Sequence, residues 1–304
     1  MKNKKTLFTS IGIIIAAIIV SIFAFVPIDR THDVAHKTWM SRVDDSVRIK
    51  DLSIPGTHDS GATHSIADVA GKCQDISIAT QLDIGVRFFD LRLQLVNDEF
   101  IITHDFVKQN LKFETVMNDL NSFITENKDE FILISIKQEA SSVDSTMYFD
   151  DALKAKLLSY SSTVCLDSSL PETLGEARGK IYVLSRSASN LGIPAYSGWA
   201  DDTTFELNDM YIQDDYRIQY LDQKRKAIQE TIEYTNEHSD KLVLNFTSCY
   251  ADPGFPPLYA GVVAHSINPW ILNMFKSRPD VKLGIIVADF ITEQLSYAIY
   301  MRNL

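Results

Sequence analysis

The segment FILISIK, residues 131–137, is almost continuously apolar and rich in β-branched side chains. A run of this kind, without regular alternation of polar residues, is typical of a strand that is buried on both faces, and such strands occur mainly in parallel sheets. The segments KLVLNFT (241–247) and KLGIIVAD (282–289) have the same character. Together these segments predict a parallel sheet that is covered by helices.

Further strand-like segments alternate with amphipathic stretches along the chain. The predicted strands are residues 51–54, 86–93, 99–104, 131–137, 180–185, 210–216, 241–247 and 282–289, and the predicted helices are residues 113–128, 150–162, 221–239, 268–278 and 292–303. Eight such strands in roughly 270 residues fit a (β/α)8 TIM barrel. Because residues 94–98 are too few for a crossover helix, we expect an irregular α/β barrel that forms a single domain over residues 39–304.

The first 26 residues differ from the rest of the chain. Residues 1–5, MKNKK, are cationic, and residues 7–26 are uncharged and mostly apolar. This pattern is typical of an export signal, and the apolar stretch is also long enough to span a bilayer as a helix. We therefore expect a secreted, extracellular protein in which residues 1–26 are either a signal peptide or an anchor on the outer face of the cell membrane.

The overall composition is that of an ordinary globular protein. Of the 304 residues, 45% are hydrophobic and 23% are charged, and the net charge at pH 7 is −11. This acidity argues against nucleic acid as a partner, and a membrane would have to be bound through apolar contacts. Cys73, Cys165 and Cys249 match no metal motif, and either one disulfide with a free thiol or three small buried side chains would account for them.

Ionisable and polar side chains gather at the ends of the predicted strands, where barrel enzymes place their active sites. His58 and Asp59 follow the first strand, and Asp90 and Arg92, two residues apart, point to the same face of the second. The other strand ends carry His104, Lys137, Glu139, Asp214, Tyr216 and Asp289. Each has an ordinary alternative, such as a satisfied core histidine, a helix-capping Asp289 or a structural ion pair of Asp90 with Arg92. Their joint placement at one rim favours a catalytic site.

Two histidines, an arginine and supporting carboxylates suit one type of reaction. A neutral imidazole can take a proton from an attacking hydroxyl while an imidazolium protonates the leaving oxygen. A guanidinium can hold a phosphate with its planar fork, and carboxylates can orient the imidazoles and raise their pKa. Such a set can cleave a phosphodiester that has a neighbouring hydroxyl group without a metal ion.

Eight motifs resemble, in order and approximate spacing, those of the secreted bacterial phosphatidylinositol-specific phospholipases C, which belong to the X-domain family. They are SIPGTHDSG, QLDIGVRFFDLRL, ITHD, ILISIKQE, EARGKIYVLSR, YIQDDY, LVLNFTS and GIIVADFI, and the similarity covers residues 39–304. The resemblance implies an irregular TIM barrel that binds membrane phosphatidylinositol. It also implies a lyase reaction that yields diacylglycerol and inositol 1,2-cyclic phosphate.

Carried over by position, the resemblance implies that the two histidines form an acid–base pair. His58, oriented by Asp289, would be the general base for the inositol 2-hydroxyl. His104, supported by Asp59, would be the general acid for the leaving diacylglycerol oxygen. The residues that the resemblance assigns to binding inositol are Lys137, Arg178, Asp214 and Tyr216.

The resemblance further implies that Arg92, held by Asp90, stabilises the charge on the phosphate. Calcium-dependent relatives have an acidic residue at this position. A guanidinium there supplies the positive charge that a calcium ion would bring, so we expect catalysis without calcium and without a cofactor. The alternative is that Asp90, Glu139 and Asp214 gather a cation, but Lys137 and Arg92 lie between them in the sequence.

Two regions depart from the family pattern. The residue after the second histidine is usually glycine, whereas here it is Asp105, whose carboxylate could raise the pKa of His104 or repel an anionic substrate. Secreted members insert tryptophans into the membrane, but residues 64–77 contain none. Tyr250, Phe255 and Tyr259 are the candidate apolar wedges, although packing within their loop would explain them equally well.

Two other functions stay open at this point. One is a metal-dependent, glycerophosphodiesterase-like enzyme on the same barrel, which EDTA would inhibit. The other is a non-catalytic surface protein that binds inositol lipids, although the presence of both histidines, Arg92 and Asp289 argues against it. The sequence also leaves open whether a monomeric phospholipase of this kind cleaves the glycosylphosphatidylinositol (GPI) anchors of proteins.

Overall fold

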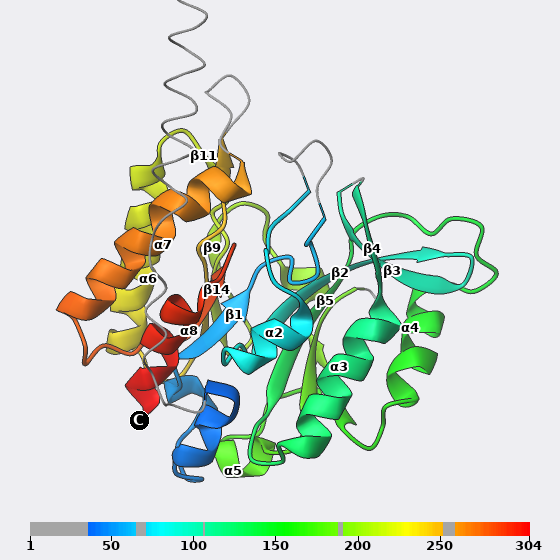
Figure 1. Ribbon diagram of the computed structural model, residues 1–304, viewed down its shortest axis with the longest axis horizontal. Coiled ribbons are helices and arrows are strands. Elements are labelled where there is room, and N and C mark those ends of the chain that lie inside the picture. The colour runs from blue at the N-terminus through cyan, green and yellow to red at the C-terminus, as the bar shows by residue number, and fades with distance from the viewer. Residues whose placement is uncertain (1–35, 65–70, 106, 188–190, 252–258) are drawn as a thin grey trace, which may run out of the picture. The chain divides into compact units, whose positions relative to one another are not determined.

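A curled sheet of mainly parallel strands forms the centre of the molecule (Figure 1). The computed structural model describes residues 36–64, 71–105, 107–187, 191–251 and 259–304. The strand order is β6-β7-β5-β2-β1-β14-β12-β10-β9. In chain order, these strands are β1 (Ile54–Thr57), β2 (Phe88–Val96), β5 (Ile132–Gln138), β6 (Val164–Cys165), β7 (Ile181–Arg186), β9 (Thr204–Leu207), β10 (Met210–Gln213), β12 (Leu242–Phe246) and β14 (Ile285–Ala288).

The sheet is an open half-barrel, and the predicted closed ring of eight strands is wrong. Strand β9 ends the sheet antiparallel to β10, and within the described residues no pairing joins this edge to β6 or to β8 (Ile193–Pro194) at the other. Residues 99–104 are not a barrel strand either. They form β3 (Glu99–His104), which pairs antiparallel with β2 and with β4 (Val107–Lys112). An irregular α/β fold with a curled, parallel-rich sheet is confirmed.

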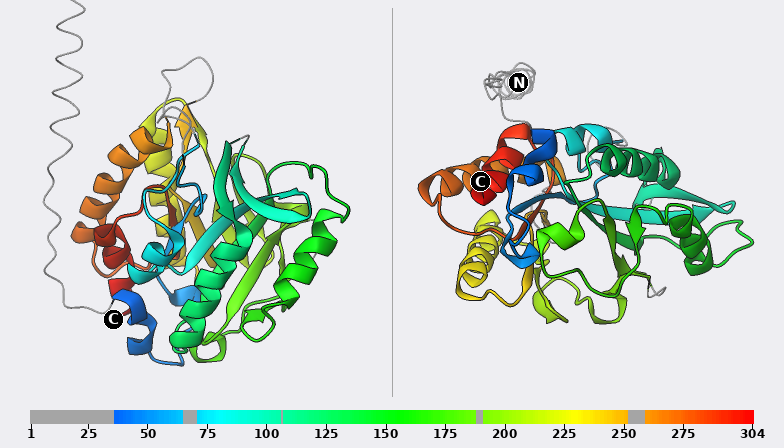
Figure 2. Two further views of the ribbon diagram at one scale, coloured as in Figure 1. Left: turned by 45° about the vertical axis from the view of Figure 1, so that its right-hand side comes forward. Right: turned by 90° about the horizontal axis from the view of Figure 1, so that it is seen from below.

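Helices cover the outer face of the sheet. Figure 1 shows α3 and α4 beside one half and α6 and α7 beside the other, and the view from below in Figure 2 shows the helices outside the curled strands. The longer helices are α3 (Phe113–Glu126), α4 (Phe149–Leu158), α6 (Leu221–Glu237), α7 (Ala260–Ser277) and α8 (Glu293–Tyr300). The shorter elements are α2 (Ile78–Asp83), α5 (Leu174–Ala177), η1 (His36–Arg42), η2 (Ile49–Asp51), η3 (Tyr196–Gly198), η4 (Met301–Asn303), β11 (Arg217–Ile218) and β13 (Tyr250–Ala251).

Both faces of the central strands are buried, which explains why their sequences are so continuously apolar. Ile134 of β5 belongs to the core that includes residues of helices α3 and α4. Its neighbour Leu133 packs on the opposite face, in a second cluster with Trp39 of η1. Successive side chains of a strand point to opposite faces, so every second residue of β5 faces the interior of the half-barrel.

The first strand begins later than predicted, because Asp51 is the last residue of the short helix η2 and, of residues 51–54, only Ile54 belongs to β1. The strand continues through Pro55 and Gly56, which argue against a strand in the sequence. A Cβ atom on Gly56 would lie 3.0 Å from the Cβ of Phe88 and 3.1 Å from the carbonyl oxygen of Ile286. Glycine therefore allows the strands on both sides to close around β1.

The predicted export segment, residues 1–26, lies outside the described residues. Among the residues that are described, no helix combines the length and apolar character needed to cross a membrane.

Helix α7 is longer than predicted, because it begins at Ala260 and contains Pro269 in its interior.

Candidate active site

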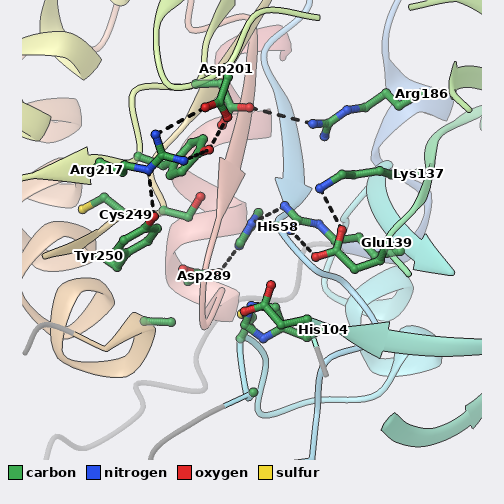
Figure 3. A pocket seen from close by; sticks show the side chains of 18 of the residues that line it. His58, His104, Lys137, Glu139, Arg186, Asp201, Arg217, Cys249, Tyr250 and Asp289 are labelled. Atoms are coloured by element: carbon green, nitrogen blue, oxygen red, sulfur yellow. Dashed lines mark hydrogen bonds and ion pairs between the residues drawn. The ribbon is translucent and has the colours of Figure 1, made fainter. Parts of the chain in front are cut away.

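A cavity of about 800 Å³ opens at the carboxyl ends of the parallel strands. Figure 3 shows Lys137, Glu139 and Arg186 on one side of it and Arg217, Cys249 and Tyr250 on the other, with His58 between them. Other lining residues are Lys72, Cys73, Arg92, His104, Asp105, Tyr196, Trp199, Asp201, Asp214, Tyr216, Tyr259 and Asp289. The predicted site residues line this pocket except for three: Asp59 and Asp90 are buried against Arg92, and Arg178 lies elsewhere.

Three cations lie side by side on adjacent strands. Arg92 of β2 pairs in register with Lys137 of β5, which pairs with Arg186 of β7. Residues paired in parallel strands point to the same face, and this face is the interior of the half-barrel. The apolar interior positions of the strands thus give way to a row of positive charges where the strands end.

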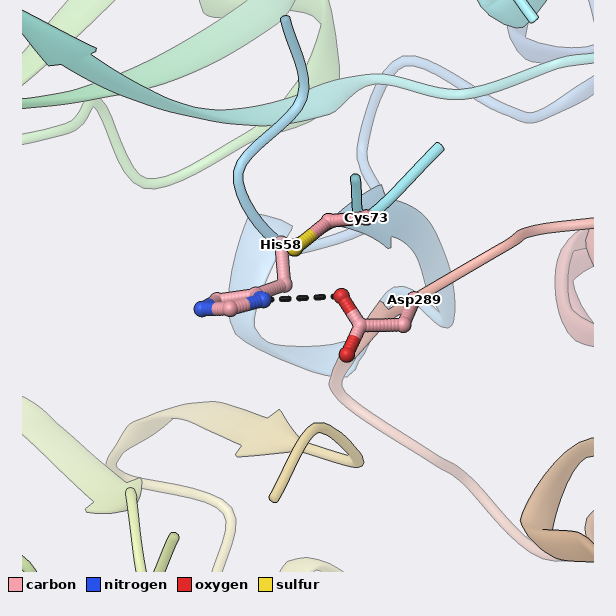
Figure 4. Close-up of side chains that lie close together, drawn as sticks. All are labelled: His58, Cys73 and Asp289. Atoms are coloured by element: carbon pink, nitrogen blue, oxygen red, sulfur yellow. Dashed lines mark hydrogen bonds and ion pairs between the residues drawn. The ribbon is translucent and has the colours of Figure 1, made fainter. Parts of the chain in front are cut away.

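His58 is the first residue after β1, and both of its ring nitrogens are engaged. Its Nδ1 lies 2.8 Å from Oδ1 of Asp289, which follows β14, and Arg92 donates an N–H from Nη2 to Nε2 over 2.7 Å. Nε2 is therefore the unprotonated nitrogen of the neutral ring, and Nδ1 donates to Asp289. Figure 4 shows this contact with Cys73 next to it.

Two carboxylates together set the pKa of His58. Burial, the largest single influence, lowers this pKa, as does the charge of Arg92, but the charge and hydrogen bond of Asp289 and the charge of Asp59 together raise it above its ordinary value. A histidine held in one tautomer with a raised pKa is suited to accept a proton at Nε2.

Asp59 lies between the two predicted catalytic histidines. Its Oδ2 is 3.6 Å from Nε2 of His58, 3.7 Å from Nε2 of His104 and 3.2 Å from Nε of Arg92. Its side chain is 1% exposed, and burial raises its pKa although the neighbouring cations oppose this. The backbone of Asp59 is left-handed with φ of 42°, a strained conformation of the kind that is often found at functional sites.

His104 reaches the pocket because β3 runs back along β2. Ile102 pairs with Leu93, so the returning strand brings His104 toward the level of Arg92. The next residue, Asp105, has φ of 50°, and glycine, asparagine and aspartate tolerate this left-handed conformation best. Asp105 can therefore occupy a position at which the family usually has glycine. Its carboxylate is 72% exposed and 4.0 Å from Nε2 of His104.

Arg92 is surrounded by carboxylates. Its Nε lies 3.2 Å from Oδ2 of Asp90, and its Nη1 lies 3.3 Å from Oε1 of Glu139. Burial would raise the pKa of Glu139, but the charges of Arg92 and Lys137 outweigh it and lower the pKa to about 2. Burial is likewise outweighed at Asp90, where Arg92 and Arg186 lower the pKa. These carboxylates are ionised and hold the guanidinium at the floor of the pocket.

The structure does not bring Arg178 to this pocket, so its predicted role in binding inositol must be corrected. Its guanidinium forms an ion pair with Asp45 over 2.7 Å and donates to the carbonyl oxygens of Met40 and Val43. Arg178 precedes β7 and therefore lies at the amino end of the strand, away from the pocket. Arg186, the last residue of the same strand, lines the cavity.

Arg186 was missed, although the sequence contains a signal for it. Tyr182, Leu184 and Arg186 are spaced by two, so the interior face of β7 predicts Arg186 at its end. Its guanidinium lies 3.6 Å from the ring centroid of Trp199 and 3.9 Å from Oδ2 of Asp214. Trp199 Nε1 donates to the same carboxylate over 3.0 Å. Trp199 comes from a connecting segment that the sequence does not single out.

The far wall of the pocket is a polar network around Tyr216. The hydroxyl of Tyr216 donates to Asp201, and Arg217 forms an ion pair with Asp201 over 3.3 Å. Arg217 also donates from Nε to the hydroxyl of Tyr250 over 3.0 Å, and the rings of Tyr216 and Tyr250 are 5.7 Å apart. Tyr250 and Tyr259 are 41% and 44% exposed, whereas Phe255 lies outside the described residues.

Comparison with known proteins shows which class of protein has this fold and a similar sequence. Residues 52–187 match the family model described as phosphatidylinositol-specific phospholipase C, X domain. This segment includes His58, Asp90, Arg92, His104 and Lys137. The resemblance predicted from the sequence motifs is confirmed.

The similarity to individual members of the family extends over most of the chain. A 1-phosphatidylinositol phosphodiesterase from Staphylococcus aureus is 27% identical over 277 residues, which cover 84% of this chain and 88% of the relative. The protein of the same name from Listeria monocytogenes is 29% identical over 283 residues, or 90% of this chain and 86% of the relative.

The solved structures of bacterial phosphatidylinositol-specific phospholipases C share the fold. A structure of the enzyme from Staphylococcus aureus has a TM-score of 0.76 at 24% identity and covers 86% of this chain and 97% of its own. The structure from Listeria monocytogenes has a TM-score of 0.72 at 24% identity and covers 89% and 100%. The half-barrel is thus the architecture of these proteins as well.

Proposed function

We propose that this protein is a phosphatidylinositol-specific phospholipase C that cleaves phosphatidylinositol to diacylglycerol and inositol 1,2-cyclic phosphate. The observation that carries the proposal is the imidazole of His58 held between Asp289 at Nδ1 and Arg92 at Nε2, with His104 on the other side of Asp59. The names of the relatives, 1-phosphatidylinositol phosphodiesterase, support the same substrate.

The first step is attack of the inositol 2-hydroxyl on phosphorus. His58 accepts the hydroxyl proton at Nε2, and Asp289 stabilises the imidazolium that forms. In the structure this nitrogen accepts an N–H of Arg92 over 2.7 Å. A bound phosphate competes for the same N–H, so substrate binding turns Arg92 toward the phosphate and frees His58 for the hydroxyl.

The second proton transfer releases diacylglycerol. His104 in its protonated form gives its proton to the departing oxygen, and the buried carboxylate of Asp59 lies 3.7 Å from Nε2. Attack, phosphorus–oxygen cleavage and the two proton transfers balance without water, and the ring-closed phosphate is the product. Lys137, Arg186, Asp214 and Tyr216 are the groups that we propose to bind the inositol hydroxyls and ring.

Arg92 is proposed to take the place of a metal ion in stabilising the phosphate charge. Calcium prefers six to eight oxygen ligands. The carboxylates that could supply them are engaged with cations: Asp90 with Arg92 over 3.2 Å, Glu139 with Lys137 over 2.7 Å, and Asp214 with Arg186 over 3.9 Å. This pairing supports catalysis that does not require calcium and argues against a metal-dependent glycerophosphodiesterase.

We place the activity outside the cell on the strength of the predicted export segment, residues 1–26. Tyr250 and Tyr259 line the cavity and are partly exposed, so they are the described side chains best placed to touch a lipid surface at its mouth. All proposed catalytic groups come from one chain, which is consistent with an active monomer. A GPI anchor has the same inositol phosphodiester and is a second substrate to be tested.

The test is release of diacylglycerol from phosphatidylinositol in detergent micelles by the wild-type protein and by His58→Ala and His104→Ala. Each variant should lose activity by about 10³-fold, since each removes a group that transfers a proton. His238→Ala is the matched control, because His238 is exposed at the end of α6 and should leave activity unchanged. Undiminished turnover in either pocket variant would contradict the proposal, and lipid binding without turnover by the wild type would favour a binding protein.

A further inference from the structure

Cys73 occupies an unexpected place, beside both proposed catalytic histidines. It lines the active-site cavity, and its side chain is 1% exposed. Its backbone N–H donates to the carbonyl oxygen of Ala62 over 2.8 Å, and its carbonyl oxygen accepts from the N–H of Phe290 over 2.7 Å. The thiol is therefore fixed in position next to the catalytic groups, and the proposed reaction makes no use of it.

Two groups of three potential metal ligands share this thiol. In one, Cys73 lies with His58 and Asp289, as Figure 4 shows, and in the other it lies with Asp59 and His104, with the ligand atoms of each group within 4.8 Å of one another. The first group is already satisfied. His58 uses Nδ1 for Asp289 and Nε2 for Arg92, at 2.8 and 2.7 Å, so it has no lone pair free for a metal ion.

The second group is different, because the contacts between its members are long. Sγ of Cys73 lies 3.9 Å from Nδ1 of His104, and Oδ2 of Asp59 lies 3.7 Å from Nε2 of the same ring. Asp59 is 1% exposed, and within the described residues neither of its carboxylate oxygens has a hydrogen-bond partner. A tetrahedral zinc site places its ligand atoms about 3.5 Å apart, so the His104 ring must rotate to bring one nitrogen, Nε2, toward both Asp59 and Cys73.

We propose that Asp59, Cys73 and His104 form an inhibitory site for a soft divalent cation, with zinc as the best fit. A thiolate, an imidazole and a carboxylate are zinc ligands, and a set with one thiol and one imidazole does not suit calcium. The thiol proton passes to the solvent when the metal–sulfur bond forms. The fourth position of the tetrahedron is left for water or a phosphate oxygen from the cavity.

The inhibition rests on the proposed function, whereas the metal site does not. A zinc ion bound to Nε2 of His104 occupies the lone pair that must carry the proton for the leaving group, and it removes the Asp59 carboxylate that supports this histidine. The charge of Arg92 opposes a nearby cation, but Asp90 and Glu139 lie 3.2 and 3.3 Å from its guanidinium and balance it. Zinc should therefore stop turnover, and EDTA should restore it.

The site can be tested without substrate by using cobalt(II) as a spectroscopic probe for zinc. Metal-free full-length protein should bind one cobalt ion in the cavity with a thiolate-to-metal charge-transfer band, and zinc should displace it whereas excess calcium should not. Cys73→Ser should lose the band and bind zinc at least about 100-fold more weakly. Cys165→Ser is the matched control, because Cys165 is also a free thiol but does not line the cavity.

A second variant keeps the test decisive if Cys73→Ser fails to fold. His104→Asn retains the thiol but removes the imidazole, so it should also bind zinc more weakly. A charge-transfer band that persists in Cys73→Ser, zinc affinity equal in wild type and His104→Asn, or no cobalt binding by the wild type would each overturn the site. Zinc bound at this site with full turnover would overturn the inhibition and the role of His104, but would leave the metal site standing.

Discussion

Two buried arginines, one directly before strand β2 and one within it, differ in their partners and in their exposure to the cavity. Arg87, just before the strand, has no exposed surface and pairs with the equally buried Glu130 over 2.8 Å. It also donates to the carbonyl oxygens of Leu82, Val86 and Lys37. Arg92, five residues later, shares three carboxylates and a histidine, and its side chain is 14% exposed to the cavity.

The difference lies in how completely each set of partners is satisfied. Burial raises the pKa of Glu130 and lowers that of Arg87 despite their contact, as expected for a closed pair held inside a core. Around Arg92, by contrast, Oδ1 and Oδ2 of Asp59 lack hydrogen-bond partners within the described part of the chain. A structural arginine is saturated, whereas an arginine poised for a ligand sits among groups that are not.

The largest effect is expected at Arg92, the arginine that faces the cavity. Arg92→Gln should lower kcat for phosphatidylinositol by about 10³-fold, because it removes the preorganised charge that faces the phosphate. Arg92→Lys should recover only part of the loss, since it restores the charge but not the planar fork. Steady-state kinetics and urea unfolding should be measured together. Full activity of Arg92→Gln would show that the two arginines do not differ in function.

At Arg87, the fully buried arginine, a large effect is expected on stability and none on activity. Arg87→Met should lower the free energy of unfolding by about 3–5 kcal/mol, because it leaves the buried carboxylate of Glu130 without its partner. The kcat of the folded protein should be unchanged. The double variant with Glu130→Leu should regain most of the stability, and a loss as large as in the single variant would mean that the pair itself is required.

The smallest effect should appear in the pH dependence of unfolding. The lowered pKa of Glu139, about 2, means that its stabilisation is present above its unfolded pKa near 4.5 and is lost as the pH falls toward 2. Glu139→Gln should therefore flatten the acid limb of stability in this range. The raised pKa of Glu130 has the opposite sign, so Glu130→Gln should not flatten it. Equal acid limbs for the two variants would contradict the assigned charge states.

Much of the active site was predictable because it lies on regular elements. The spacing of two between Asp90 and Arg92, and the position of His58 directly after a strand, are enough to predict that these side chains lie together at one end of the sheet. Arg178 was misplaced because the motif around β7 contains two arginines. Only the alternation of side chains along the strand, which puts Arg186 on the interior face, distinguishes them. The charge row formed by Arg92, Lys137 and Arg186 depends on strand register, which the sequence does not reveal.

The features that could not be predicted depend on long-range geometry. The closed ring was predicted from the number of strand segments, but the antiparallel hairpin of β3 and β4 uses one of them outside the barrel. Trp199 and Asp201 reach the pocket through a segment without a regular period. Cys73 was uninformative in the sequence because its distance from His104 depends on how the chain packs after His58.

The central claim is that His58, His104 and Arg92 cleave the phosphodiester by attack of the neighbouring hydroxyl, without a metal ion. The most direct measurement is phosphorus NMR of the products formed from phosphatidylinositol micelles in excess EDTA. We predict a cyclic phosphodiester resonance that appears before any inositol monophosphate. Monophosphate as the first product, or turnover that requires added calcium, would contradict the claim.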